Sequence, residues 1–149
     1  MSGLQTVTTP RLRIETVATR EATRFLSEMI QMFLKEGLGL SIESPDSVRV
    51  RLAITEALSN VARHGYPNGE TGPLTHEMAR EGAHLVAVVQ DYGEAFDPSD
   101  RIEAVIPRGD ELAEGGYGLG IIRAVMDELS HEHDANDGNR FTMKKKLWD

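Results

Sequence analysis

The sequence predicts an α+β fold in which three helices cover one face of a mixed, mostly antiparallel sheet. Two observations lead to this prediction. Segments typical of strands occur in adjacent pairs, at residues 72–96 and again at 130–148, and do not alternate singly with helices. The segments typical of helices carry an apolar stripe, so each has one side to bury against a sheet. A doubly wound parallel sheet requires regular strand–helix alternation and is therefore disfavoured.

The N-terminal part predicts one strand and two helices. Residues 11–17, RLRIETV, alternate polar and apolar side chains as a half-buried strand does. Residues 21–35 repeat apolar side chains at helical spacing until the glycines of EGLGL. A second helix is expected over residues 45–64, with Ser44 as its cap and Pro45 in its first turn.

The C-terminal part predicts two hairpins separated by a loop and a helix. Residues 72–96 read as two strands joined at REGA, and Asp91 ends the second strand. Residues 96–118 are rich in glycine, proline and charge, which predicts a mobile loop. A third helix starts at Leu119, and two terminal strands follow around the turn NDGN.

Composition limits the classes of function. A chain of 149 residues fits a single domain, 1–149. A formal charge of −8 argues against a nucleic-acid partner, and no apolar run is long enough to cross a membrane. Because cysteine is absent and no signal peptide is recognisable, we expect a cytoplasmic protein.

Polar side chains gather beside the buried stripe of the second helix. At 100° per residue, Glu56, Asn60, Arg63 and His64 fall on one flank. The opposite, solvent-facing side is expected to hold Arg51, Thr55, Ser59 and Ala62. The polar flank is either a solvated shoulder with ordinary i,i+4 contacts or the wall of a ligand cleft.

Two further segments favour the ligand cleft. Asp91 follows an apolar strand, so its carboxylate could accept a hydrogen bond from a ligand's amino group, with Gly93 allowing a flat ring to approach. The glycines of EGGYGLGII precede a helix, where backbone N–H groups could converge on phosphate oxygens. Taken singly, the first could be a plain turn and the second a hinge, and the second matches neither the P-loop nor the dinucleotide fingerprint.

The three segments together resemble the GHKL superfamily of ATP-binding domains, which includes histidine kinases, gyrase-type topoisomerases and Hsp90. EALSNVARHGY looks like the N box, DYGEAFDP like the first glycine box and GGYGLGI like the second. The resemblance implies a Bergerat-type two-layer sandwich. A chain of this length looks most like the anti-sigma factor serine/threonine kinases of bacterial partner-switching systems.

The resemblance implies roles for particular residues. Glu56 matches a general base, Asn60 a ligand of Mg²⁺, and Asp91 the reader of the adenine amino group, with Gly93 beneath the ring. The second box, which would hold the phosphates of ATP, comprises Gly116, Tyr117, Gly118, Leu119 and Gly120. The resemblance also implies that the loop at about residues 96–118 is a mobile ATP lid. Arg63 and His64 follow the N box and are implied to touch phosphate or this lid.

The implied function is transfer of the γ-phosphoryl group of ATP to a STAS-type anti-anti-sigma protein, together with binding of a sigma factor or another regulator. The alternative is a catalytically silent nucleotide-binding module that switches partners. The resemblance also implies a homodimer that uses the first strand and helix. Ala95 departs from the common pattern, which has a second glycine there. No phosphoacceptor-histidine helix precedes the domain, so a complete sensor kinase is not expected.

Two remaining patterns have simpler interpretations. His131 and His133 share one strand face, which we interpret as a solvated strand in preference to a metal site. Three consecutive lysines at residues 144–146 predict a protected edge strand.

Overall fold

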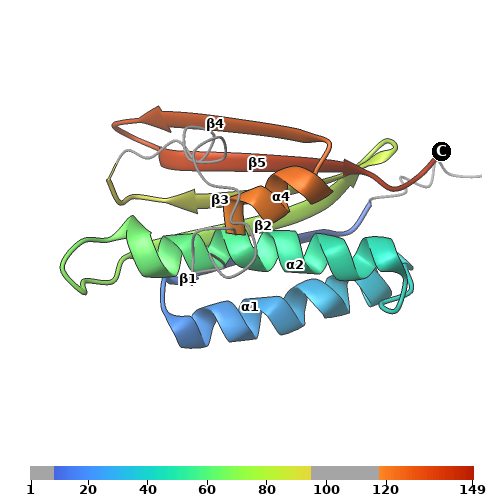
Figure 1. Cartoon of the computed structure of the whole chain (residues 1–149), viewed down its shortest axis with the longest axis horizontal. Coiled ribbons are helices and arrows are strands. Elements are labelled where there is room, and N and C mark those ends of the chain that lie inside the picture. Colours follow the sequence, from blue (N-terminus) through green and yellow to red (C-terminus); the bar gives the residue numbers. More distant parts are fainter. Residues whose placement is uncertain (1–8, 95–117) are drawn as a thin grey trace, which may run out of the picture.

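The structure of the chain is a computed structural model that describes residues 9–94 and 118–149. A layer of helices lies against one face of a sheet (Figure 1). The helical elements are α1 (Arg20–Met32), η1 (Phe33–Gly37), α2 (Pro45–Asn60), η2 (Val61–Gly65) and α4 (Gly118–Val125). The strands are β1 (Arg11–Val17), β2 (Pro73–Glu81), β3 (His84–Asp91), β4 (Glu128–Asp134) and β5 (Gly138–Lys146).

The five strands of the described chain form one sheet in the order β1-β2-β3-β5-β4. All of its pairings are antiparallel, and helices cover one face, so the predicted fold class is confirmed. The last strand, β5, lies between β3 and β4. This register places Asp91 of β3 opposite both Leu74 of β2 and Asn139 of β5.

The two long helices begin at side-chain caps and end in wider turns. The Thr19 hydroxyl accepts a hydrogen bond from the Ala22 N–H at 3.0 Å. The Ser44 hydroxyl accepts one from the Ser47 N–H at 3.2 Å, as the sequence predicted. Such caps satisfy N–H groups that have no partner inside the helix. Each helix then continues as a π-helical turn, η1 after α1 and η2 after α2.

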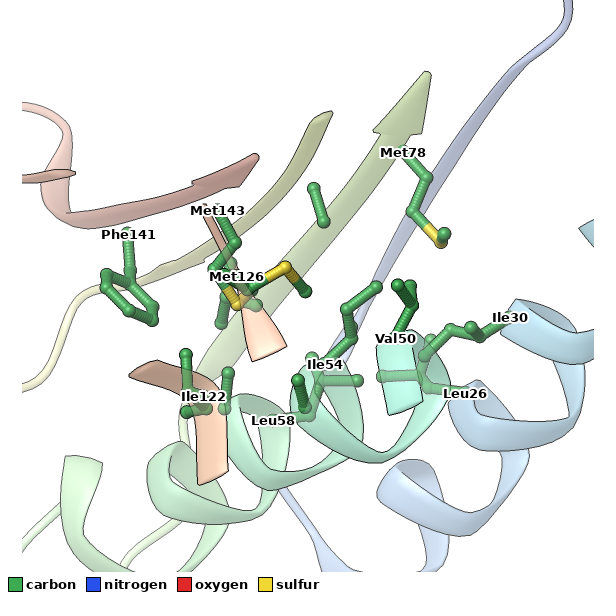
Figure 2. Packing of buried hydrophobic residues seen from close by; sticks show 14 of the residues in the cluster. Leu26, Ile30, Val50, Ile54, Leu58, Met78, Ile122, Met126, Phe141 and Met143 are labelled. Atoms are coloured by element: carbon green, nitrogen blue, oxygen red, sulfur yellow. The ribbon is translucent and has the colours of Figure 1, made fainter. Parts of the chain in front are cut away.

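The core lies between the sheet and the helices (Figure 2). Its helical half consists of buried side chains of α1, α2 and α4, among them Leu26, Ile30, Val50, Ile54, Leu58 and Ile122. Its sheet half includes Leu74, Met78, Val89, Phe141 and Met143. Removal of this apolar surface from water is the main stabilising contribution and fixes α2 above the middle of the sheet.

Helix α2 is the central helix, because it contacts α1 on one side and α4 on the other. The α1 contact is polar. The Arg51 Nε donates to the Ser27 carbonyl at 3.1 Å, Arg51 also bonds Gln31, and Thr55 donates to the Ser27 hydroxyl at 3.2 Å. The prediction of a solvent-facing side at Arg51 and Thr55 is therefore wrong, since a second helix covers that side.

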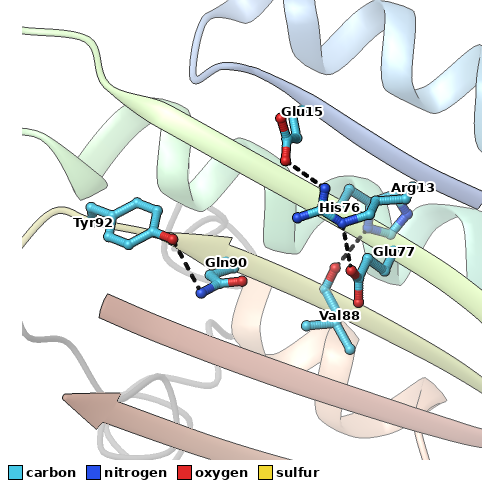
Figure 3. A network of polar contacts seen from close by, with 7 residues as sticks. All are labelled: Arg13, Glu15, His76, Glu77, Val88, Gln90 and Tyr92. Carbon is cyan, nitrogen blue, oxygen red and sulfur yellow. Dashed lines mark hydrogen bonds and ion pairs between the residues drawn. The ribbon is translucent and has the colours of Figure 1, made fainter. Parts of the chain in front are cut away.

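The helix-free face of the sheet is polar. The Arg13 Nε donates to Glu77 at 2.9 Å, and Arg13 also bonds Glu15 (Figure 3). Hydrogen bonds to Glu15 and then to Glu77 raise the pKa of the Arg13 guanidinium. The lysines at residues 144–146 belong to β5, which has a strand on both sides. The prediction of an edge strand there is wrong, because the edge position is taken by β4.

The predicted lid lies almost wholly outside the described residues. Ala95, Gly116 and Tyr117 also lie outside them. Over residues 9–94 and 118–149, no helix is both long and apolar enough to span a membrane.

Candidate functional site

Asp91 ends β3 as the sequence predicted, and its side chain is buried. Its Oδ1 accepts hydrogen bonds from the Gly93 N–H at 2.9 Å and from the Asn139 Nδ2 at 3.0 Å. Neither bond uses Oδ2. A buried carboxylate is costly unless it is hydrogen-bonded, so these donors stabilise Asp91 in one orientation.

The turn after Asp91 packs against the end of the central helix. A Cβ atom added to Gly93 would lie 1.8 Å from the carbonyl oxygen of Gly65 in η2. The same oxygen accepts a hydrogen bond from the Glu94 N–H at 3.3 Å. Gly93 is therefore required by close packing of the turn on the helix end, which is a reason that sequence inspection did not supply.

The Tyr66 hydroxyl forms two hydrogen bonds that connect segments next to Asp91. Its hydroxyl donates to the Pro73 carbonyl at 2.5 Å and accepts from the Tyr92 N–H at 2.9 Å. Partial burial raises the pKa of the Tyr66 phenol, which further favours the protonated form that donates to the Pro73 carbonyl. The residue thus ties the start of β2 to the turn that follows Asp91.

A pocket opens above Asp91, between α2 and the end of the sheet. It is lined by Ala57, Asn60, Val61, His64, Gly65, Val89, Asp91, Glu94, Leu119, His131, Asn139 and Phe141. The structure thus brings together four residues that the sequence predicted separately: Asn60, His64, Asp91 and Leu119. The pocket volume is about 40 Å³, room for a few water molecules, so a purine ring can enter only if the walls separate.

Asn60 contributes an unsatisfied amide to this pocket. Its Nδ2 is buried, and no described residue supplies a hydrogen-bond acceptor for it. Such a group is rare in proteins and indicates a missing ligand or water. Rotation of the amide by 180° would present Oδ1 at the same place, since the two ends are assigned and not observed.

The residues at this site fit a magnesium ion that takes most of its oxygen ligands from a bound phosphate compound and water and few from the protein. The described residues contain no cluster of three or more carboxylate, histidine or cysteine side chains that could hold a metal. Mg²⁺ prefers oxygen ligands and commonly takes only one or two from protein, with water and phosphate completing its shell. Asn60 with its amide rotated could supply one such oxygen.

Glu56 and Arg63 lie on the other side of α2. They line a groove with residues from both helices, formed by Arg20, Thr23, Arg24, Ser27, Thr55, Glu56, Ser59, Ala62 and Arg63. The Arg63 guanidinium lies 3.5 Å from the Glu56 carboxylate. The predicted single flank is thus divided between two hollows, because the central helix has a neighbour on each side and η2 shifts the helical phase.

Asn139, His131 and His133 are site residues that sequence reasoning missed. Both imidazoles lie within hydrogen-bond distance of the Asn139 Oδ1, and His131 lines the pocket. The interpretation of β4 as a solvated strand agrees with its burial, since most of its residues, His133 included, are exposed; His131 is half-buried at the pocket. Their spacing of two residues was a usable signal, but only the register of β4 with β5 places them beside Asn139.

Two glycines near Asp91 differ from the glycine at the helix start. Gly138 has φ +66°, and a Cβ added there would lie 2.2 Å from the Asp91 carbonyl oxygen. A Cβ added to Gly120 of α4 would meet nothing within 4 Å. Packing therefore requires glycine at residues 93 and 138, whereas at residue 120 packing does not.

Comparison with known proteins gives a consistent result. The profile of the histidine kinase-like ATPase domain family matches residues 13–145. The chain is 27% identical over 135 residues to an anti-sigma F factor of Clostridium kluyveri, covering 90% of this chain and 92% of that protein. It is 33% identical over 105 residues to the serine-protein kinase RsbW of Bacillus pumilus, covering 66% of this chain and 64% of that protein. The RsbW kinase of Oceanobacillus iheyensis is 32% identical over 97 residues, covering 62% of this chain and 60% of that protein.

Proposed function

The chain belongs to the histidine kinase-like ATPase domain family, and on that premise we propose that it is an ATP-dependent serine/threonine protein kinase and anti-sigma factor. Its substrate would be a STAS-type anti-anti-sigma protein, and it would also sequester a sigma factor or an equivalent regulator. The names of its relatives support both activities. The observation that carries the proposal is a pocket at Asp91 whose lining includes the buried amide of Asn60, with the Glu56 carboxylate about one helical turn away along the same helix.

Asp91 is the proposed reader of the nucleobase. Its Oδ1 already accepts two hydrogen bonds, and Oδ2 would accept one from the 6-amino group of adenine. Apolar side chains beside it, Val61, Leu119 and Phe141, would contact the ring faces. The purine would enter by separating the walls of the small pocket.

The phosphates would extend from this pocket past Asn60 toward the N-terminus of α4. Gly118, Leu119 and Gly120 lie in the first turn of that helix, where N–H groups and the helix dipole favour an anion. Gly116 and Tyr117 are proposed to complete this binding segment. Mg²⁺, when bound through Asn60, would neutralise phosphate charge.

Glu56 is the proposed general base. A serine or threonine hydroxyl of the partner would approach along the groove toward the end of the phosphate chain near Asn60, and it would donate its proton to the Glu56 carboxylate about one helical turn away. Its oxygen would form a bond to the γ-phosphorus as the bond to the β-phosphate oxygen breaks, and ADP would leave. Arg63, 3.5 Å from Glu56, would restrict where that carboxylate points.

A homodimer through the first strand and helix is part of the proposal. Val17, Phe25 and Met32 are between 46% and 57% exposed, which is unusual for large apolar side chains on adjacent elements. Burial of these side chains against a second copy would remove apolar surface from water.

The test uses two variants and two measurements. Incubation with a STAS protein, ATP and Mg²⁺, followed by intact mass spectrometry, should show one added phosphoryl group. Glu56→Ala should retain nucleotide binding and lower transfer by about 10²–10⁴-fold. Asp91→Asn should lower nucleotide affinity by about 10–100-fold, because the buried site then meets the 6-amino group with one acceptor fewer.

Glu36→Ala is the matched control, since Glu36 is an exposed helical glutamate remote from both hollows. Transfer by Glu56→Ala at the wild-type rate would remove Glu56 from the role of base. Nucleotide binding with no transfer by the wild-type protein to any STAS partner would favour the catalytically silent switch.

A further inference from the structure

We propose that His131 and His133 are positioning residues for nucleobase recognition, which act through Asn139 on Asp91. This inference rests on the proposed binding of ATP in the pocket. It concerns side chains of β4 and β5 that stand on the pocket side of the sheet, in register with one another: His131 faces Phe141, and His133 faces Asn139.

Asn139 is the centre of the arrangement. Its side chain is buried, with 4% of its surface exposed. Its Nδ2 donates to the Asp91 Oδ1 at 3.0 Å and to the Glu94 carbonyl oxygen at 2.7 Å. Its Oδ1 lies 3.3 Å from the His131 Nε2 and 3.1 Å from the His133 Nδ1.

The chemistry of these partners allows one orientation of the amide. A carboxylate and a carbonyl oxygen only accept hydrogen bonds, so the NH₂ end of Asn139 must face Asp91 and Glu94. The Oδ1 end then faces the two rings and requires a donor from each. His131 must therefore carry its proton on Nε2, and His133 must carry its proton on Nδ1.

The two imidazoles thereby hold the amide against rotation. Rotation of Asn139 by 180° would place Oδ1 against the Asp91 carboxylate, where two acceptors repel each other, and the NH₂ end against two ring N–H donors. The imidazoles therefore add to the cost of rotation that Asp91 and Glu94 already impose. With them, Asp91 keeps Oδ1 engaged and offers Oδ2 to a donor. A 6-amino purine supplies that donor, whereas a 6-oxo purine would place an acceptor there. The histidine pair should therefore sharpen the preference for ATP over GTP.

The first measurement tests the arrangement without nucleotide. ¹⁵N NMR of the imidazole rings in the full chain, at a pH where they are neutral, should show His131 protonated on Nε2 and His133 protonated on Nδ1. The Nδ1 form is the less usual one for a free imidazole, so this result is specific. His133 protonated on Nε2 would overturn the proposal.

The second measurement tests the consequence for binding. His131→Leu and His133→Leu should each lower the ratio of ATP affinity to GTP affinity by about tenfold, as expected for loss of one part-buried hydrogen bond. His131→Gln and His133→Asn should restore the ratio to within about twofold of wild type, because their amide N–H groups replace the Nε2 and Nδ1 donors. A merely structural role would not distinguish the amide variants from the leucine variants in this way.

His84→Leu is the control, because His84 begins β3 and is paired with Glu81 and Lys146, away from the pocket. Unchanged ratios in both leucine variants, with ATP still bound by wild type, would overturn this inference and leave the proposed function standing. Failure of the wild-type protein to bind either nucleotide would overturn both.

Discussion

On its α4 side, helix α2 faces buried polar groups that bond to one another, whereas on its α1 side it faces an open groove. Asp91 and Asn139 belong to the first region, and both are more than 90% buried. Glu56 and Arg63 belong to the second, with side chains 23% and 39% exposed and 3.5 Å apart, and Arg63 also donates to the Ser59 carbonyl at 3.4 Å. The polar groups of the first region are held in fixed positions by one another, and the groups of the second are open to solvent.

This difference indicates that binding and transfer can be lost separately. Changes on the pocket side should disturb the fold or the affinity for nucleotide, because Asp91 and Asn139 hold each other in place through hydrogen bonds. Changes on the groove side should leave the fold almost intact, because exposed ion pairs contribute little to stability.

The largest effect is expected on the pocket side, where Gly93→Ala should lower the stability of the fold. The new Cβ would lie 1.8 Å from the Gly65 carbonyl oxygen, so either the turn or the helix end must move. We expect the free energy of unfolding to fall by about 3 kcal/mol or more, as measured by urea denaturation.

Gly120→Ala is the matched control, because its Cβ meets nothing within 4 Å. Alanine there should raise the free energy of unfolding by roughly 0.5–1 kcal/mol, since it favours helix more than glycine does. Equal stability of the two variants would contradict the claim that packing requires glycine at residue 93 and not at residue 120.

The sheet floor offers a second test through pH. His76 is completely buried, its Nδ1 donates to the Val88 carbonyl oxygen at 3.0 Å, and no described residue contacts its Nε2 through a hydrogen bond (Figure 3). Burial lowers the pKa of His76 to about 4, from a usual value of 6.5. Above pH 6.5 the ring is neutral in both folded and unfolded chains and contributes no pH dependence.

As the pH falls from 6.5 toward 4, the unfolded chain takes up a proton that the folded chain does not. Stability is therefore lost, to a total of roughly 3 kcal/mol from this residue. His76→Leu should remove that share of the acid sensitivity, measured as the difference in unfolding free energy between pH 7 and pH 4.5. Equal pH dependence in wild type and variant would contradict the lowered pKa.

The smallest effect is expected on the groove side. Arg63→Ala removes a half-exposed ion pair and should change the free energy of unfolding by less than about 1 kcal/mol. Arg51→Ala is a useful comparison, because Arg51 bonds the Ser27 carbonyl and Gln31 and links the two long helices. A loss above about 2 kcal/mol for Arg63→Ala would mean that the groove is as firmly built as the pocket.

Much of the fold could be predicted from sequence because its signals are local. The Ser44 cap, the alternation of β1 and the end of β3 at Asp91 depend on neighbouring residues alone. The order of the strands does not, which is why the lysines of β5 were assigned to an edge. The last strand in the sequence can occupy a central position in the sheet, and its own residue composition does not reveal that position.

The candidate site, like the fold, could be predicted from sequence only in part. Asn60, His64, Asp91 and Leu119 were named from their segments, and the fold brings them to one pocket. Asn139 was missed because its role depends on Asp91, which lies 48 residues away in sequence. The division of Glu56 from Asn60 was missed because a helical projection does not show which neighbour covers each flank.

The central position of β5 also has a consequence for synthesis. A ribosome completes every other described element before β5, yet Asp91 has no Asn139 and β4 has no place in the sheet until β5 inserts. Nascent or truncated chains that stop before residue 138 would therefore lack an assembled pocket. Such chains would not compete with finished molecules for nucleotide. Damaged or unfinished copies would therefore be inactive and would not interfere with intact ones.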